Sequence, residues 1–361
     1  MATDTHKREQ QLADRNAKLD ALHERLTSAV EGLVTGTDWR RALEFSARFR
    51  SRSFRNAALI AVQHGEAYNL GLVPDPIPTY VAGFRQWQSL GRTVSKGQHG
   101  YQIFAPVTGR FASTTPTDPD SWRRLTRGEC PSGGETVRSK LIGLRLAYVF
   151  DISQTDGDPI PEPPRPKILT GTAPDGLWDG LANQITDRGY GLRLVSNADA
   201  IMGRNGQTDY VLREVSMRMD MDDAAQAKTL CHELAHVILH GKAKPESIAE
   251  AQAHRGLQEV EAESVAAMVA AAHGLDTSDY TIPYVATWAT HVPGSTPIEV
   301  VQATAERVRR AALTILDGLD TDQISNGDPS GLSRDGGEPL GAAPETARSI
   351  HWTKPAKQVG L

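Results

Sequence analysis

The sequence predicts an α+β protein in which a mixed α+β domain precedes a mainly helical domain with a small sheet. The chain has 361 residues, and a domain commonly holds roughly 150. Segments in which apolar and polar residues alternate stand beside segments with the apolar spacing of helices. A proline-rich stretch, DPIPEPPRPK, separates the two groups and is too stiff to continue a helix or a central strand.

The first half is predicted to begin with two helices. Residues 1–33 have apolar residues three, four or seven positions apart among many charges, which is typical of a polar helix. A second helix is expected over 38–64, with Asp38 as its N-cap. Strands are then expected at 101–107 and 144–152. Between them, residues 108–137 are rich in Thr, Pro and Ser and are expected to form a long loop.

The second half is predicted to be mainly helical. Helices are expected at 177–188, 223–241, 255–273 and 297–316. Strands are expected at 190–195 and 209–220. Gly241 and Gly274 are expected to end the two long helices. The predicted domain plan begins with an N-terminal helix at 1–33 and a first domain at 34–160. A linker at 161–172 leads to a second domain at 173–317, and a disordered tail is expected at 318–361.

The formal net charge of −5 is an average over unlike parts of the chain. Residues 34–145 hold 16 Lys and Arg against 8 Asp and Glu, whereas the remainder holds 23 basic and 36 acidic residues. Such asymmetry favours nucleic-acid contact by the basic part.

Several classes of protein are excluded by the composition. No apolar run is long enough to span a membrane, and the N-terminus lacks the apolar segment of a secretory signal. Two cysteines, Cys130 and Cys231, are too few for a disulfide framework or a thiolate zinc cluster. We therefore expect a reducing, cytoplasmic compartment and no membrane partner.

The sequence LCHELAHVILH, at 230–240, carries the sharpest chemical signal. His232 and His236 are four residues apart on a predicted helix, so both imidazoles project from one face and can share a metal ion. Glu233 lies beside them, where it can take a proton from a water that the metal activates. The pattern predicts a zinc site with Glu233 as the catalytic base.

A catalytic zinc site needs a third protein ligand, and the downstream sequence EVEAESVAA offers three glutamates. At 100° per residue, Glu261 falls at about 40°, close to the centre of the apolar face of that helix. A buried carboxylate is costly unless it is paired or bound to a cation, so Glu261 is the first choice. Glu259 and Glu263, on the opposite side, remain alternatives.

Other residues near this motif have more ordinary expectations. Cys231 is predicted to be a small core thiol, and His240 a histidine that faces the dipole at the helix end. A peptidase also needs a donor for the oxyanion, and the sequence does not choose among Tyr280, Tyr284 and His254.

In the first domain, aromatic residues alternate with cations over 52–101. Single-strand binding combines such features, because bases stack on rings while cations follow the phosphates. Glycine-flanked cations on a turn let a phosphate approach closely. The residues expected to contact nucleic acid are Arg52, Arg55, Asn56, Trp87, Arg92 and Lys96.

The order of these motifs resembles the N-terminal domain of the ArdC-type antirestriction proteins over roughly 40–160. The matching residues are Ser53-Phe54-Arg55-Asn56, Leu59-Ile60, Gln63, Phe84, Trp87, Gly91-Arg92, Val94, Lys96-Gly97, Ala105-Pro106, Val149-Phe150-Asp151 and Gln154-Thr155. The resemblance implies a domain that binds single-stranded DNA. Relative to that family, 108–137 is an insertion, and the tail has no counterpart.

The second half resembles the ImmA/IrrE-like zinc metallopeptidases, through HELAHVILH and the downstream EAESVAA. This resemblance implies a zincin-like fold, with zinc on His232, His236 and Glu261 and with Glu233 as base. Acidic residues at places similar to Glu259 and Glu263 occur in related ArdC peptidase helices, which keeps the third ligand open. Together, the two resemblances imply a cytoplasmic antirestriction metallopeptidase that binds single-stranded DNA and cleaves an unidentified protein.

Two alternatives belong to other functional classes. In the first, the DNA-binding domain acts alone and the zinc site is structural. In the second, the chain is a regulatory protease whose first domain binds a protein. A Glu233 variant separates the first alternative from the main interpretation, and the salt dependence of binding separates the second.

Overall fold

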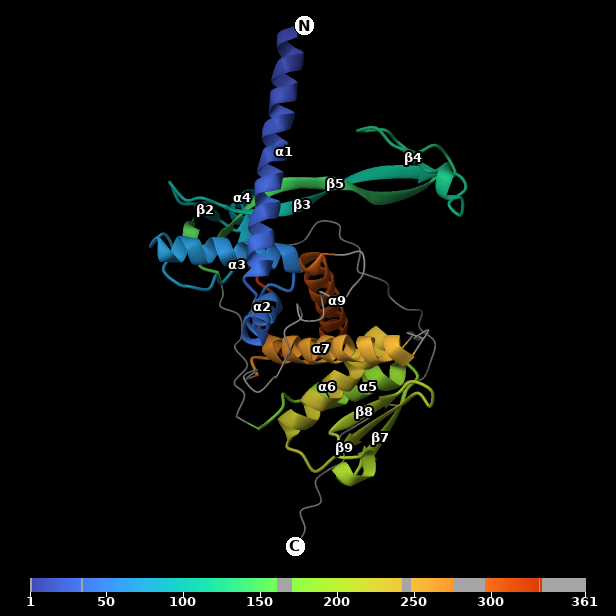
Figure 1. Cartoon of the computed structure of the whole chain (residues 1–361). Helices are drawn as coiled ribbons and strands as arrows, with labels where there is room; N and C mark the ends of the chain where they lie inside the picture. Colours follow the sequence, from blue (N-terminus) through green and yellow to red (C-terminus); the bar gives the residue numbers. More distant parts are fainter. Residues whose placement is uncertain are drawn as a thin grey trace.

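The structure is a computed structural model that describes residues 2–33, 35–160, 171–241, 248–275, 296–330 and 332, and the statements below concern these residues. Mixed helices and antiparallel strands form the first half, and helices around a small sheet form the second (Figure 1). The prediction of an α+β fold is confirmed. No described helix combines the length and the apolar character that a membrane crossing needs.

Three helices open the chain: α1 (Ala2–Glu31), α2 (Gly36–Arg48) and α3 (Phe54–Asn69). The expected helix over 38–64 is therefore wrong, because it is two helices. Ser53 interrupts it by accepting a hydrogen bond from the backbone of Asn56, which starts α3. Thr35, and not Asp38, is the N-cap of α2, and Asp38 completes a capping box with it.

The first half contains a four-stranded antiparallel sheet with the order β1-β5-β3-β4. Its strands are β1 (Val81–Gly83), β5 (Thr136–Asp151), β3 (Tyr101–Ser113) and β4 (Arg123–Arg124). A short helix and a two-stranded ribbon lie beside it, namely α4 (Phe84–Ser89) with β2 (Arg92–Val94) and β6 (Thr155–Gly157).

Strands β3 and β5 form a long hairpin that projects from the rest of the molecule (Figure 1). Their pairing runs from Tyr101 and Val149 out to Ser113 and Thr136. The expectation of a long loop over 108–137 is therefore wrong at both of its ends, which are strand. The polar composition indicated a loop, but a projecting ribbon whose β5 strand is exposed from Thr136 to Leu141 needs no apolar alternation there.

Two amide side chains of α3 close the edge of β3 near the core. Asn56 donates to the carbonyl oxygen of Phe104 at 2.9 Å and accepts from its N–H at 3.0 Å. Gln63 makes the same pair of bonds to Gln102, at 2.9 and 2.8 Å. Asn56 and Gln63 are seven residues apart, two helical turns, so both project from one face of α3 toward the strand.

The second half places helices against a three-stranded sheet with the order β7-β9-β8. Its elements are α5 (Leu177–Asp187), β7 (Gly191–Val195), β8 (Gly206–Asp209), β9 (Glu214–Arg218), α6 (Asp223–His240), α7 (Ile248–Ala272) and α9 (Pro297–Asp317). The expected strand over 209–220 is shorter and lies at β9, because a turn with Arg213 at φ 52° separates it from β8.

The helices of the two predicted domains share one hydrophobic core, which contains residues of α1, α2, α5, α6, α7 and α9. Trp39 of α2 donates to the hydroxyl of Ser264 on α7 at 3.0 Å, and both side chains are buried. In Figure 1, α7 crosses the middle of the molecule between α2 and α6. The predicted linker at 161–172 thus divides the sheets of the two halves and not their core.

Residues 318–330 connect the two halves as well. Asp328 pairs with Arg52 at 3.1 Å, and the N–H of Ile324 donates to the carbonyl oxygen of Ala272 at 2.8 Å. The expectation of a disordered tail from Gly318 is wrong for this segment, because polar partners in both halves hold it. Residues 331 and 333–361 of the predicted tail, and 161–170 of the predicted linker, lie outside the described residues.

We predict that Asn56→Ala lowers the free energy of unfolding by about 1–3 kcal/mol, because it leaves the N–H and carbonyl of Phe104 without their amide partner. Urea unfolding followed by circular dichroism measures this. The control is Arg55→Ala on the exposed neighbour, for which we expect a change within about 0.5 kcal/mol. Equal effects of the two variants would contradict the edge-closing role of Asn56.

Candidate metal centre

Helix α6 presents two imidazoles toward one point. Asp222 starts the helix by accepting a hydrogen bond from the N–H of Ala225 at 2.8 Å. His232 and His236 then lie one turn apart, and their Nε2 atoms are 3.0 Å from each other. Both rings are well covered, with His236 7% exposed.

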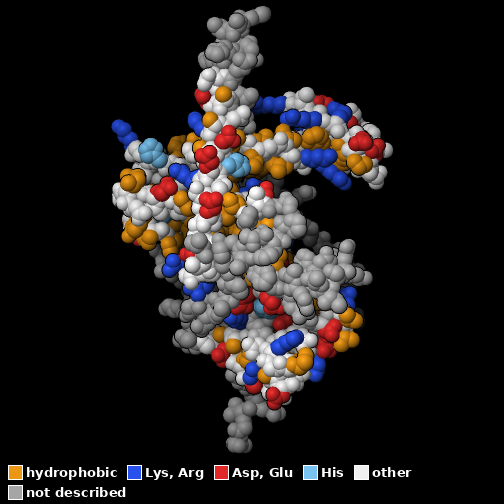
Figure 2. Space-filling view, viewed as in Figure 1, with side chains coloured by type: hydrophobic (Ala, Val, Ile, Leu, Met, Phe, Trp, Pro, Cys, Tyr) orange, Lys and Arg blue, Asp and Glu red, His pale blue; other side chains and the backbone are white. Residues whose placement is uncertain are grey.

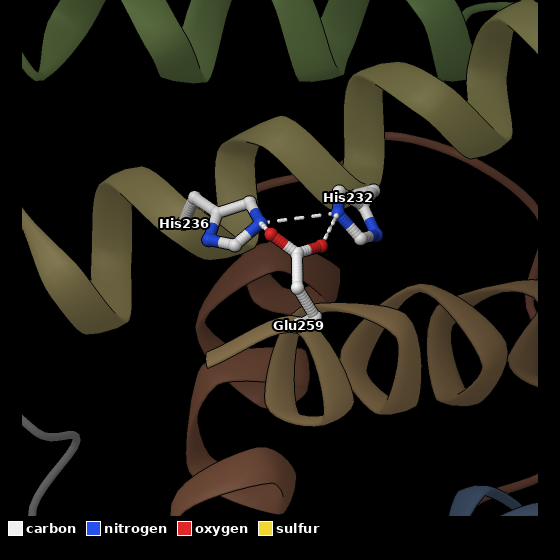
Figure 3. A group of neighbouring side chains, drawn as sticks. All are labelled: His232, His236 and Glu259. Carbon is white, nitrogen blue, oxygen red and sulfur yellow. Dashed lines mark hydrogen bonds and ion pairs between the residues drawn. The ribbon is translucent and has the colours of Figure 1, made fainter. Parts of the chain in front are cut away.

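The third group at this point is Glu259 of α7 (Figure 3). Its carboxylate oxygens lie 3.3 Å from Nε2 of His232 and 3.6 Å from Nε2 of His236. Two nitrogen ligands of a tetrahedral zinc ion lie about 3.3 Å apart, since each is about 2.0–2.1 Å from the metal. The separations of the three donors thus fit one divalent cation, and two histidines with one glutamate are a donor set of catalytic zinc sites.

The choice of Glu261 as third ligand is wrong in this geometry. Glu261 is 4% exposed, as expected for the buried face of α7, but it does not point toward His232 or His236. One carboxylate oxygen accepts from His240 at 3.0 Å, and the other pairs with Arg307 of α9. Its buried charge is thus satisfied by an arginine and a histidine instead of a metal ion.

The second ring nitrogen of each candidate ligand is also held. Nδ1 of His232 lies 3.1 Å from Glu263, which in turn pairs with Lys228 at 3.0 Å. Nδ1 of His236 lies 3.1 Å from Nδ1 of His240, whose other nitrogen meets Glu261. Such outer partners fix the orientation and tautomer of a metal-binding imidazole.

The carboxylates also set the protonation of the centre. Burial disfavours the charged imidazolium of His232, but hydrogen bonds with Glu259 and Glu263 outweigh burial and raise the pKa of His232 to about 9. Hydrogen bonds with the two imidazoles hold the pKa of Glu259 well below its ordinary value. The cluster therefore concentrates negative charge where a cation would bind, and metal binding would displace the proton of His232.

Glu233 lies beside this cluster in a buried position, 5% exposed. The hydroxyl of Thr208 on strand β8 donates to its Oε2 at 2.6 Å. Burial raises the pKa of Glu233, which moves it in the direction that a base working near neutral pH requires. Gly206 leaves the room for this carboxylate, since a Cβ there would lie 2.6 Å from Oε1 of Glu233.

The cysteines take no part in this centre. Cys231 is buried, and burial raises the pKa of its thiol, which agrees with the expectation of a core thiol. Cys130 is exposed and far along the chain, on the β3–β5 hairpin.

Two residues near the centre escaped the sequence analysis: Thr208 and Tyr210. Thr208 lies on β8 and contacts Glu233, and Tyr210 is the first residue of the turn that follows this strand. Burial raises the pKa of the Tyr210 hydroxyl, and the charges of Glu233 and Glu259 add to this shift. The sequence did not indicate these two residues, because it does not show where an edge strand lies relative to α6. Of the donors expected for the oxyanion, Tyr280 and Tyr284 and the side chain of His254 lie outside the described residues.

Four of the residues expected to contact nucleic acid are used by the fold itself, and their assignment as contacts is corrected accordingly. The first is Asn56, whose bonds to Phe104 are described above. The second is Arg52, which donates to the carbonyl oxygen of Val81 at 2.6 Å and pairs with Asp328. Trp87 is completely buried, and its Nε1 donates to the carbonyl oxygen of Phe150 at 3.0 Å.

Arg92 is the fourth of these residues. Its guanidinium donates to the hydroxyl and the carbonyl oxygen of Thr155, at 2.8 and 2.9 Å, and so fastens β2 to β6. Arg55 and Lys96 are exposed and free to bind a ligand in the described part of the chain. The sequence motif had indicated nucleic-acid contacts because cations and amides serve a phosphate and a backbone carbonyl equally well.

Comparisons with known proteins find several that are similar to part of this chain. An uncharacterized protein of Bacillus anthracis is 26% identical over 294 residues, which cover 76% of this chain and 46% of that protein, so the chain spans less than half of that relative's length. Metal-free and Mn(II)-bound crystal structures of the antirestriction ArdC protein from the R388 plasmid are 19% identical, with TM-scores of 0.43 and 0.40. The alignments cover 73% of this chain and 84% and 87% of those chains.

A family match covers the first half. Residues 19–150 match the family described as the N-terminal domain of anti-restriction factor ArdC. This range contains all of α2 and α3 and most of the four-stranded sheet. The chain therefore carries an ArdC-type N-terminal antirestriction domain over residues 19–150.

Proposed function

We propose that this protein is an antirestriction zinc metallopeptidase whose first half binds single-stranded DNA. The observation that carries the peptidase part is the convergence of His232, His236 and Glu259 beside Glu233. Two imidazoles and one carboxylate are a donor set suited to zinc, and when bound such an ion polarises a peptide carbonyl and makes a water more acidic. An ImmA/IrrE-like zincin relationship is part of this proposal.

The residues around the centre have complementary tasks. Glu233 accepts the proton of the attacking water, for which its raised pKa is suited. Thr208 holds one oxygen of Glu233 and leaves the other available for the proton. Glu263 and His240 keep the two imidazoles oriented through their Nδ1 atoms.

Strand β8 supports a peptide as the substrate. It is one of the two outer strands of the sheet β7-β9-β8 among the described residues, and its Thr208 contacts Glu233. An extended peptide can add to such an edge through main-chain hydrogen bonds, which bring a peptide bond beside the base. The protein substrate itself is not identified by these features.

The nucleic-acid part of the proposal rests on the family match and on charge. The matched family is described as a domain of an anti-restriction factor, and restriction enzymes act on DNA. Residues 34–145 carry 16 basic and 8 acidic residues. A positively charged surface of this kind supplies most of the affinity in binding that does not depend on sequence.

We predict that Glu233→Gln keeps its metal but hydrolyses denatured casein at least about 100-fold more slowly, because the amide cannot take the proton. Metal content by mass spectrometry and casein fragments on gels measure the two effects. Full protection of DNA from restriction by Glu233→Gln, together with no cleavage by the wild type, would instead support a structural metal site. Loss of the metal in this variant would contradict its role as a base.

We predict that Glu259→Gln and Glu261→Gln affect the metal differently. Glu259→Gln changes the ligand set, so the visible spectrum of the Co²⁺-substituted protein should change and zinc affinity should fall by about 100-fold or more. Glu261→Gln acts through His240 and should keep the spectrum while lowering affinity by about 10-fold. Competition with a chelator measures affinity, for Zn²⁺ and Mn²⁺ side by side. A changed spectrum in Glu261→Gln alone would restore Glu261 as the ligand.

We predict that Gly206→Ala slows hydrolysis by about 10-fold or more while the metal is retained. The added Cβ would lie 2.6 Å from Oε1 of Glu233, so the carboxylate has to move. Casein hydrolysis and metal content are again the measurements. Gly191→Ala in the same sheet is the control, since its Cβ would meet nothing nearer than 3.9 Å. Wild-type hydrolysis in Gly206→Ala would show that Glu233 does not need this position.

A further inference from the structure

The outer part of the β3–β5 hairpin, which we call the arm, consists of residues 108–141. Figure 1 shows it extending away from the helices, beyond the point where α1 and α3 cover the sheet. Along β5, every residue from Thr136 to Leu141 is exposed. Strand β4 adds only two residues beside β3, and a ribbon of two strands is only marginally stable on its own in water. Among the described residues, no side chain of the arm belongs to the hydrophobic core clusters, although Ala112 is buried.

On one face of the arm, the charge of Arg123 is neutralised internally. Ala112, Val137 and Arg123 are paired across the strands, so their side chains share this face. Arg123 forms ion pairs with Glu129 and with Glu135, the latter at 2.9 Å. The positive charge of Arg123 is thus balanced by two carboxylates of the arm itself.

The opposite face has cations without such carboxylates. Phe111 is paired with Arg138 on one side and with Arg124 on the other, so the three share this face. Lys140 is two residues from Arg138 and lies on the same face. Within the described part of the chain, Arg124, Arg138 and Lys140 form no ion pair. Figure 2 shows Lys and Arg side chains gathered along the arm beside hydrophobic ones.

Two aromatic rings lie among these cations. The guanidinium of Arg138 is 4.9 Å from the ring centre of Trp122, and the ammonium group of Lys140 is 5.0 Å from it. Lys140 is also 5.3 Å from the ring of Phe111. Both rings are half-buried, so part of each remains open to solvent. Cations and partly open rings therefore share one face of the arm.

We propose that this cationic and aromatic face of the arm, formed by Phe111, Trp122, Arg124, Arg138 and Lys140, is a binding site for single-stranded DNA. It rests on the DNA-binding part of the proposed function and gives that function a location. Phosphates take the place of water around the three cations, and bases stack against Trp122 and Phe111. Such contacts depend little on sequence, because every base offers a flat face.

A single strand fits this face better than a duplex. The bases of a duplex are already stacked on each other, so Trp122 and Phe111 would gain nothing from them. In a single strand the bases are free to leave their own stack for a ring. The rings also hold the cations in place before binding, through the contacts of Arg138 and Lys140 with Trp122.

The test compares two arginines on opposite faces of the same arm. Arg138→Gln removes a cation from the proposed site. Arg110→Gln removes one from the other face, where the guanidinium donates to the carbonyl oxygen of Glu129 at 3.5 Å. Anisotropy of a labelled oligothymidylate of about 20 nucleotides reports binding. For Arg138→Gln we expect weaker binding and a salt slope smaller by about 0.7, and for Arg110→Gln neither.

Substitutions of the ring test stacking separately from charge. Trp122→Ala should weaken oligothymidylate binding by about 5-fold or more, and Trp122→Phe should restore most of it, because phenylalanine also stacks. Thermal unfolding of each variant checks that the fold is retained. Binding that is equally weak in Trp122→Phe and Trp122→Ala would overturn the stacking role.

The outcomes separate the arm from the function on which it rests. If the wild type binds and the affinity falls equally in Arg138→Gln and Arg110→Gln, or in neither, the arm is overturned as the site while DNA binding stands. No binding of the oligothymidylate by the wild type would overturn both. Tighter binding of a duplex of the same length would overturn the single-strand assignment.

Discussion

Carboxylates on α7 meet imidazoles on α6, from the buried Glu261 to the exposed Glu259, and this pairing determines how the two helices are arranged. Glu259 contacts His232 and His236, while Glu263 contacts His232 from the other side of its ring. Glu261 contacts His240 at the end of α6. A buried charge without a partner is costly, so a shift of either helix along the other would leave several groups unpaired at once. The register of α6 against α7 is thus fixed by the same groups that form the candidate metal centre.

Most of the elements, and two of the three candidate metal ligands, follow from the sequence. His232 and His236 are expected to converge from their spacing alone, because residues four apart on a helix share a face. The third ligand was not identified in this way, because helical phase assumes a single buried face. Helix α7 is buried on nearly every side from Val260 to Ala270, since it packs between α2 and α6. On such a helix the phase of Glu261 says that it is buried, but not which neighbour it meets.

The same limit applies to the residues that first suggested nucleic-acid contact. Arg92 and Asn56 offer donors that suit a phosphate or base, and the fold uses those donors on its own backbone. Nothing in the linear sequence shows that β3 would have an open edge beside α3. Only the position of the strand explains why Asn56 and Gln63 are two turns apart.

The excess of positive charge in the first half therefore becomes more informative once the internal uses are removed. Arg52 and Arg92 bind main-chain oxygens, and Arg123 is balanced by two glutamates. What remains for a partner includes Arg138 and Lys140, on a ribbon that contributes little to the core. Keeping like charges together on a thin, exposed ribbon destabilises it through repulsion. A bound polyanion removes that repulsion, which explains how one face can lack the carboxylates that the other face has.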